Sequence, residues 1–205
     1  NTVIEPLLDP SLKLKGSKVK STAVNESLGY TEWTLKNGIK VVVRPSTLKA
    51  DEVIIYATAK GGKSMLSDAD YFHGDYLAMV MQQSGISKFS ATELAKQLSG
   101  KSAHASVGVG AYEHAVSAGG SPKDIETILQ LMYLNFTAPR FDETDLQNLK
   151  NMYVPYFRNM EADPDYHMGK EFSKTLYNNH PRRQVTSAEQ IESLNIETLA
   201  NVHKQ

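Results

Sequence analysis

Short runs of alternating or continuous apolar residues predict strands in the first third of the chain. Residues 30–35 and 39–44 are two such runs, on either side of Asn37-Gly38. Asn-Gly between strand-like runs favours a tight hairpin turn, because both residues tolerate a positive φ. A third strand is expected over 52–59, which is rich in Val, Ile and Tyr and ends before Gly61-Gly62. The pattern therefore indicates a hairpin followed by another strand.

The period changes to that of a helix after Asp68. Tyr76, Leu77, Val80 and Met81 fall on one helical face ahead of Gly85, which is expected to end the helix. Ser90-Ala-Thr-Glu93 has the spacing of a capping box and predicts a short second helix. Residues 102–120 return to period two and bend near Gly108 and Gly110, which indicates a second hairpin.

Helices are predicted for the rest of the chain. The first follows Ser121-Pro122, and a second, starting at Asp142, is expected to bend at Pro155. Three more are expected after Asp163-Pro164, after a capping box Thr186-Ser-Ala-Glu189, and from Asn195 to His203. In the helix that follows Ser121-Pro122, an apolar stripe is expected to face the core; its members are Ile125, Ile128, Leu129, Met132, Tyr133 and Phe136.

The order of these elements predicts the fold class. Strands, helices, strands and helices in that sequence indicate an α+β protein, with an antiparallel sheet covered by helices on one face. Residues 1–28 are interrupted by Pro6, Pro10 and Gly16 and are interpreted as a linker segment. Residues 29–205 are expected to form a single domain.

Composition excludes several classes of function. A net charge of −1 over 205 residues offers no positive field for nucleic acid or an anionic membrane. The chain has no cysteine, which excludes disulfides, thiolate metal ligands and cysteine nucleophiles. No apolar run approaches the roughly 18 residues of a membrane helix, so membrane insertion is not expected. The lack of cysteine fits the cytosol and a bacterial envelope compartment equally well.

Three segments in this order resemble the pitrilysin/insulinase family of M16-like, inverzincin metallopeptidases. Trp33–Val43 is similar to the opening hairpin of that family, and Gly61-Gly62 to its strand end before a helix. His180-Pro-Arg-Arg-Gln with Thr186–Ile191 resembles its His-Pro loop and the helix start that follows. The resemblance implies a domain like those of pitrilysin and the mitochondrial processing peptidase, with ferredoxin-like elements. Such domains continue with another strand and helix, so a truncated sheet with an exposed edge, prone to self-association, is expected.

Active members of the family carry His-x-x-Glu-His on the helix after the Gly-Gly strand. Histidines at i and i+4 grip one zinc ion, and the glutamate serves as general base for the zinc-bound water. The matching helix here reads Asp75-Tyr-Leu-Ala-Met-Val-Met81, and the motif is absent from the whole chain. The resemblance therefore implies the fold without the chemistry: no catalytic residue and no metal ligand are expected, and zinc belongs only to the catalytic half of a parent protein.

The function that this implies is structural. We expect the chain to be the first domain of a non-catalytic half, which closes a peptide-degrading chamber and is inactive alone. Its expected partners are the catalytic half, or a separate catalytic subunit, and peptide substrates. Two alternatives remain open: an inactive subunit that pairs with a separate zinc-bearing chain, and an assembly or core protein without a peptidase role. These choices depend on analogy, because a fold does not determine a function.

Several histidines have an alternative interpretation as metal ligands. His104 and His114 could approach across the second hairpin, but Glu113 would face away from His114 and no third ligand is evident. His73, in the first turn of its helix, is expected to be solvated. His167 and Glu171 have i, i+4 spacing, which favours support of a helix over metal binding.

His180, Arg182 and Arg183 form the one basic cluster with a candidate role. It is a possible contact for an acidic peptide substrate or for the catalytic half of the parent protein. The alternative, which we prefer at this point, is that these side chains fix the conformation of their own loop.

Overall fold

The computed structural model describes residues 4–205, which form two compact units. One unit is Pro6–Glu52, and the other is Val53–Gln205 together with Ile4 and Glu5. The smaller unit holds a three-stranded antiparallel sheet, in the order β1-β2-β3; its strands are β1 (Val19–Asn25), β2 (Tyr30–Leu35) and β3 (Lys40–Val43). The predicted hairpin at Asn37-Gly38 is confirmed. Gly38 has a φ of 88°, and its N–H donates to the carbonyl of Leu35.

Strand β1 was not indicated by the sequence, which gave the segment 1–28 no regular element. Its residues pair with β2 from Val19 opposite Leu35 to Asn25 opposite Tyr30. Six of the seven β1 residues are exposed. Because neither face of the strand is buried, no alternation of apolar and polar residues is imposed on it, and the period-two signal is missing.

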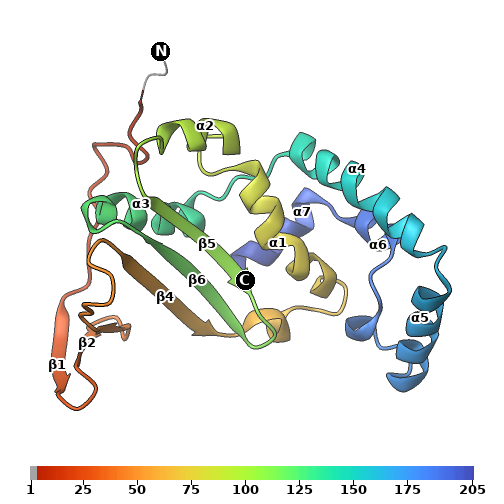
Figure 1. The fold of residues 1–205 in the computed structure, drawn as a ribbon, viewed down its shortest axis with the longest axis horizontal. Coiled ribbons are helices and arrows are strands. Elements are labelled where there is room, and N and C mark those ends of the chain that lie inside the picture. Colours follow the sequence, from red (N-terminus) through yellow and green to blue (C-terminus); the bar gives the residue numbers. More distant parts are fainter. Residues whose placement is uncertain (1–3) are drawn as a thin grey trace. The chain divides into compact units, whose positions relative to one another are not determined.

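The larger unit is built on a second antiparallel sheet in the order β4-β6-β5. Its strands are β4 (Val53–Lys60), β5 (Ala103–Val109) and β6 (Glu113–Gly120). Helices α1 (Tyr71–Ser84) and α3 (Ile125–Thr137) cover one face, where Val116 and Ala118 are buried (Figure 1). The opposite face leaves Ile54 and Tyr56 exposed. The predicted α+β class is confirmed, with two three-stranded sheets instead of one.

The remaining helices follow the predicted order. They are α2 (Ala91–Gln97), α4 (Glu143–Met160), α5 (Pro164–Leu176), α6 (Ala188–Ser193) and α7 (Ile196–Lys204), with 3-10 turns η1 (Gly62–Met65), η2 (Pro122–Asp124) and η3 (Pro181–Arg183). Helix α4 continues through Pro155. In the larger unit, α5 lies at the end away from the sheet (Figure 1). Over residues 4–205, no helix has the length and apolar character needed to cross a membrane.

Helix starts agree closely with the local signals, with one shift. The capping box of Ser90 and Glu93 is present as predicted, and Asn195 caps α7. The second capping box uses Ser187 and Gln190 instead of Thr186 and Glu189. Two overlapping frames compete in this segment, because each has the required spacing. The frame that starts at Ser187 is the one that forms, and the carbonyl of Thr186 accepts a hydrogen bond from the Tyr166 hydroxyl at 2.7 Å.

Helix α3 exists as predicted but turns a different face to the core. Ile128 is buried, yet Leu129 and Phe136 of the same expected stripe are exposed by 52% and 58%. The face that packs under the sheet instead contains Thr127, Ile128, Leu131, Leu134 and Asn135. Apolar residues surround most of this helix, so its sequence contains two competing stripes, and contact with β5 and β6 decides between them.

The core of the larger unit lies where α1 meets α4, α6 and α7. Leu77, Val80 and Met81 of α1 are buried there, as predicted. They belong to one apolar cluster with residues of α4, α6 and α7 and of the turn between α6 and α7. The fully buried members of this cluster include Leu146, Leu149, Ile191, Leu194 and Leu199. This cluster positions α1, the helix in which the resemblance led us to look for a zinc motif.

Truncating Leu149 to alanine should destabilise the fold by about 2–5 kcal/mol, because the side chain is fully buried and its loss leaves a cavity. The matched control is Leu129→Ala on α3, where half of the side chain is already exposed, and we expect at most about 1 kcal/mol. Chemical denaturation of both variants checks this. Equal losses of unfolding free energy would contradict the core assigned to α1 and its neighbours.

Candidate functional site

The corner before α1 is held by close backbone contact with the turn between β5 and β6. Gly61 and Gly62 have φ of 142° and 63°. A Cβ at Gly62 would lie 2.4 Å from the carbonyl oxygen of Gly110, so only glycine fits there. The N–H of Lys63 donates to the same oxygen at 2.8 Å, and that of Gly62 lies 3.2 Å from Nε2 of His114. The Gly-Gly pair therefore fixes the start of η1, the turn that leads toward α1.

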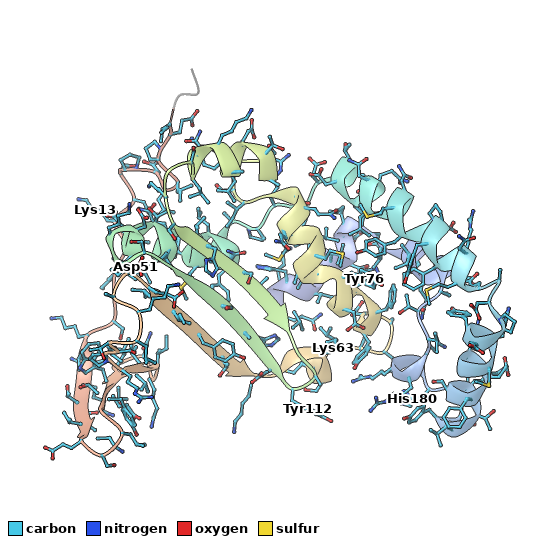
Figure 2. All side chains as sticks on the ribbon, in the orientation of Figure 1. Lys13, Asp51, Lys63, Tyr76, Tyr112 and His180 are labelled. Carbon is cyan, nitrogen blue, oxygen red and sulfur yellow. The ribbon has the colours of Figure 1, made fainter. Side chains whose placement is uncertain are left out.

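The charged residues around the start of α1 are engaged with one another. Lys63 forms an ion pair with Asp75 and lies over the ring of Tyr71, 4.7 Å from its centroid. Figure 2 labels Lys63 below α1 and Tyr76 along that helix. Burial raises the pKa of the Tyr76 hydroxyl, which faces Thr186 and Tyr153. Lys63 and Asp75 therefore neutralise each other's charge beside the ring of Tyr71.

His73 is buried, which corrects the expectation that it is solvated. Only 7% of the residue is exposed, and Nδ1 has no hydrogen-bond partner. Its Nε2 lies 3.3 Å from the side-chain nitrogen of Asn195, whose oxygen already accepts the N–H of Thr198. An amide nitrogen donates, so this contact favours a neutral ring with Nε2 as acceptor, whereas a hydrogen bond with the backbone of Ser193 favours the protonated ring. Desolvation lowers the pKa of His73, against a smaller opposing effect of Asp70.

The lowered pKa of His73 predicts loss of stability in acid. A neutral buried histidine binds a proton less readily than the unfolded chain does, so the free energy of unfolding should fall as the pH drops below about 6.5. His73→Leu should reduce this slope between about pH 7 and 5, and His167→Leu, at an exposed histidine, should not. Urea unfolding across this range measures both. Identical slopes in the wild type and His73→Leu would contradict the assignment.

The other candidate metal ligands, which are the pair His104 and His114 and the pair His167 and Glu171, do not come together in space. His104 is opposite Gly119 and His114 is opposite Val109, so the two lie five residue pairs apart along the hairpin and on opposite faces. Glu171 lies 3.9 Å from Lys174 and not beside His167, whose ring meets Tyr166 edge-on. Across residues 4–205, no three His, Asp or Glu side chains are grouped in a way that could hold a metal ion. The residues do not fit the zinc site of the active peptidases.

The basic cluster divides into two parts. His180 caps η3, and its Nδ1 accepts the N–H of Arg182 at 3.2 Å. Arg182 turns toward the start of α1. Its Nε lies 2.5 Å from Asp68, its Nη2 donates to the carbonyl of Leu66, and its guanidinium lies over the Tyr71 ring. Arg182 therefore joins two segments that are more than 100 residues apart in the chain.

Arg183 turns to the other side of the loop. Together with His180 it lines a cavity of about 410 Å³ between α5 and the start of α6 (His180 is labelled in Figure 2). Lys170 and Lys174 of α5 line the same cavity. Sequence reasoning missed both lysines, although their i, i+4 spacing places them on one helical face, which is the signal that would have found them.

Replacing Arg182 and Arg183 one at a time tests this division of the basic cluster. Arg182→Ala should cost about 1–2 kcal/mol, because it removes charge-assisted hydrogen bonds to a carboxylate and a carbonyl. Arg182→Lys should recover little of this, since an ammonium cannot make the same planar set of bonds. Arg183→Ala should stay within about 0.5 kcal/mol of the wild type. Thermal unfolding measures all three, and an equal loss for Arg182→Ala and Arg183→Ala would contradict the division.

Comparison with known proteins finds a similarity of structure alone. No protein-family model matches the sequence, and no curated protein sequence matches it either. Among solved structures, the chain is similar to the ferredoxin protease FusC, in its complex with Arabidopsis ferredoxin, at 17% identity and a TM-score of 0.77. That match covers 99% of this chain and 23% of FusC. The periplasmic protease PqqL from Escherichia coli gives 17% identity and a TM-score of 0.78, covering 100% and 22%.

A third similar structure is the peptidase M16 inactive domain from Pseudomonas fluorescens. The identity is 19% and the TM-score 0.64, over 85% of this chain and 42% of that one. The fold is therefore similar to that of M16 peptidase domains, an inactive one among them, which confirms the resemblance at the level of structure. The chain spans less than a quarter of FusC and of PqqL.

Proposed function

We propose that this chain is a non-catalytic domain that helps to enclose the chamber of a larger M16-like zinc metallopeptidase, which degrades peptides. The observation that carries the proposal is the state of α1. Leu77, Val80 and Met81 are part of the core, and the nearby polar residues His73 and Asp75 are buried or paired. Zinc ligands on this helix would need a polar face, and α1 uses that surface for packing.

Exposed apolar stripes on two helices support packing against further protein. On α5, Met168, Phe172 and Leu176 follow one another at i, i+4 and i+8, and each is more than half exposed. On α3, Leu129 and Phe136 are exposed in the same way. Continuous apolar stripes of this kind mark interaction surfaces in soluble proteins. In the proposal, they pack against the catalytic half or a separate catalytic subunit, and zinc is bound only there.

The purified chain should not cleave unstructured peptides such as casein fragments, and should contain no stoichiometric zinc after dialysis against a weak chelator. Both expectations follow from the missing ligand set on α1. A peptide-release assay and elemental analysis of the same sample measure them. Activity that survives a further purification and disappears in His73→Ala or Asp75→Ala, with folding intact by circular dichroism, would overturn the proposal.

The coding sequence on either side of this segment distinguishes two forms of the proposal. A His-x-x-Glu-His motif in the same polypeptide supports a single-chain peptidase with a catalytic and a non-catalytic half. The motif in a separate chain that co-purifies with this one supports a two-subunit enzyme. Its absence from both would contradict the proposal and leave a peptidase-free assembly role.

A further inference from the structure

The cavity beside η3 has an unusual local charge for this protein. Three cations line it, Lys170 and Lys174 from α5 and Arg183 from the loop, against one carboxylate, that of Glu189. Within residues 4–205, neither Lys170 nor Arg183 forms an ion pair, and the partner of Lys174 is Glu171 at 3.9 Å. The whole chain has a net charge of −1, so this excess of positive charge is local. Unpaired cations around a concave surface attract anionic groups.

The loop that bears Arg183 is held in place by several bonds. Asn178 and Asn179 have φ of 50° and 53°, and they turn the chain back along α5. Asparagine tolerates this conformation better than most residues. The carbonyl of Arg183 accepts a hydrogen bond from the Ser173 hydroxyl at 2.5 Å. The N–H of Arg183 donates to the carbonyl of His180 at 2.9 Å. The backbone of Arg183 is therefore fixed against α5.

The guanidinium itself is also oriented. It lies over the ring of Tyr177, 5.3 Å from the centroid. Stacking on an aromatic face restricts the plane of the group and leaves its N–H donors at the edge. A planar fork of donors matches the two oxygens of a carboxylate, and the lysines add point charges beside it.

The start of α6, which also lines the cavity, does not provide an anion site. Its capping box engages the N–H groups of Ser187 and Gln190, and the N–H of Ala188 donates to the carboxylate of Glu161 at 2.8 Å. Glu189 adds a negative charge at the rim. A dianionic phosphate would therefore depend on exposed side chains alone and would be repelled by Glu189. A carboxylate carries a single negative charge, so Glu189 repels it less than a phosphate dianion, and it needs fewer donors.

We propose that this cavity binds the carboxylates of an acidic peptide segment, through Arg183, Lys170 and Lys174. The inference rests on the proposed function, since it gives a chamber wall a preference among peptides. The volume of the cavity, about 410 Å³, falls within the usual range of ligand sites. Binding through exposed charges should be weak and should decrease as salt is added.

The test is fluorescence anisotropy with a labelled peptide of alternating glutamate and glycine, against the same peptide with glutamine. The glutamate peptide should bind, and Lys170→Gln/Lys174→Gln/Arg183→Gln should weaken it at least about tenfold. The control, Arg44→Gln/Lys96→Gln/Lys123→Gln, changes the net charge equally at exposed residues outside the cavity and should bind as the wild type does. The double variant Lys170→Gln/Lys174→Gln serves if the triple variant is unstable.

Three outcomes would overturn the proposal. These are no binding of the glutamate peptide, equal weakening by both triple variants, and preferential binding of inorganic phosphate over the peptide. The assay measures binding by the chain itself, so its failure leaves the expected lack of peptidase activity untouched. Peptidase activity in the chain, in turn, would not change the measured binding.

Discussion

The packing of α1 against α4, α6 and α7 is the contact on which the larger unit depends. Leu77, Val80 and Met81 supply the α1 side of that core. In the proposed function, a metal-binding helix at this place would have to present ligands, and a helix has limited surface to divide between packing and chemistry. The apolar surface of α1 is committed to packing. Its burial contributes to the stability of the unit.

Two adjacent arginines show how one loop serves two purposes. Arg182 bonds to Asp68 and Leu66 and so fixes the approach to α1 from a distant part of the chain. Arg183, with its neighbour anchored in this way, is presented on the opposite side, over Tyr177 and into the cavity. The preference for a structural role of this cluster therefore applies to Arg182, and the proposed contact with peptide applies to Arg183.

The exposed apolar stripes on α3 and α5 are the features that the chain alone does not explain. Their side chains are exposed, whereas the facing sides of α1, α4, α6 and α7 are buried in one apolar cluster. The solved structures of similar fold are much longer chains. A surface shaped for contact with more protein is consistent with a domain that works inside a larger assembly, and this links the packing of the unit to its proposed role.

Local signals in the sequence determined the elements, whereas contacts distant in the sequence determined their faces and their pairings. The Asn37-Gly38 turn, the cap at Ser90 and the cap at Asn195 involve only a few neighbouring residues, so the sequence predicts them directly. The sequence also excluded the zinc motif, because the motif is local as well.

The tertiary structure decided those features that depend on which side chains are buried. Which stripe of α3 faces the sheet, whether His73 is solvated, and where Arg182 and Arg183 point all depend on elements from elsewhere in the chain. Strand β1 forms through its pairing with β2, without an apolar pattern of its own. Periodicity reports on neighbours along the chain; burial and electrostatic pairing depend on neighbours in space, and only the folded structure supplies those.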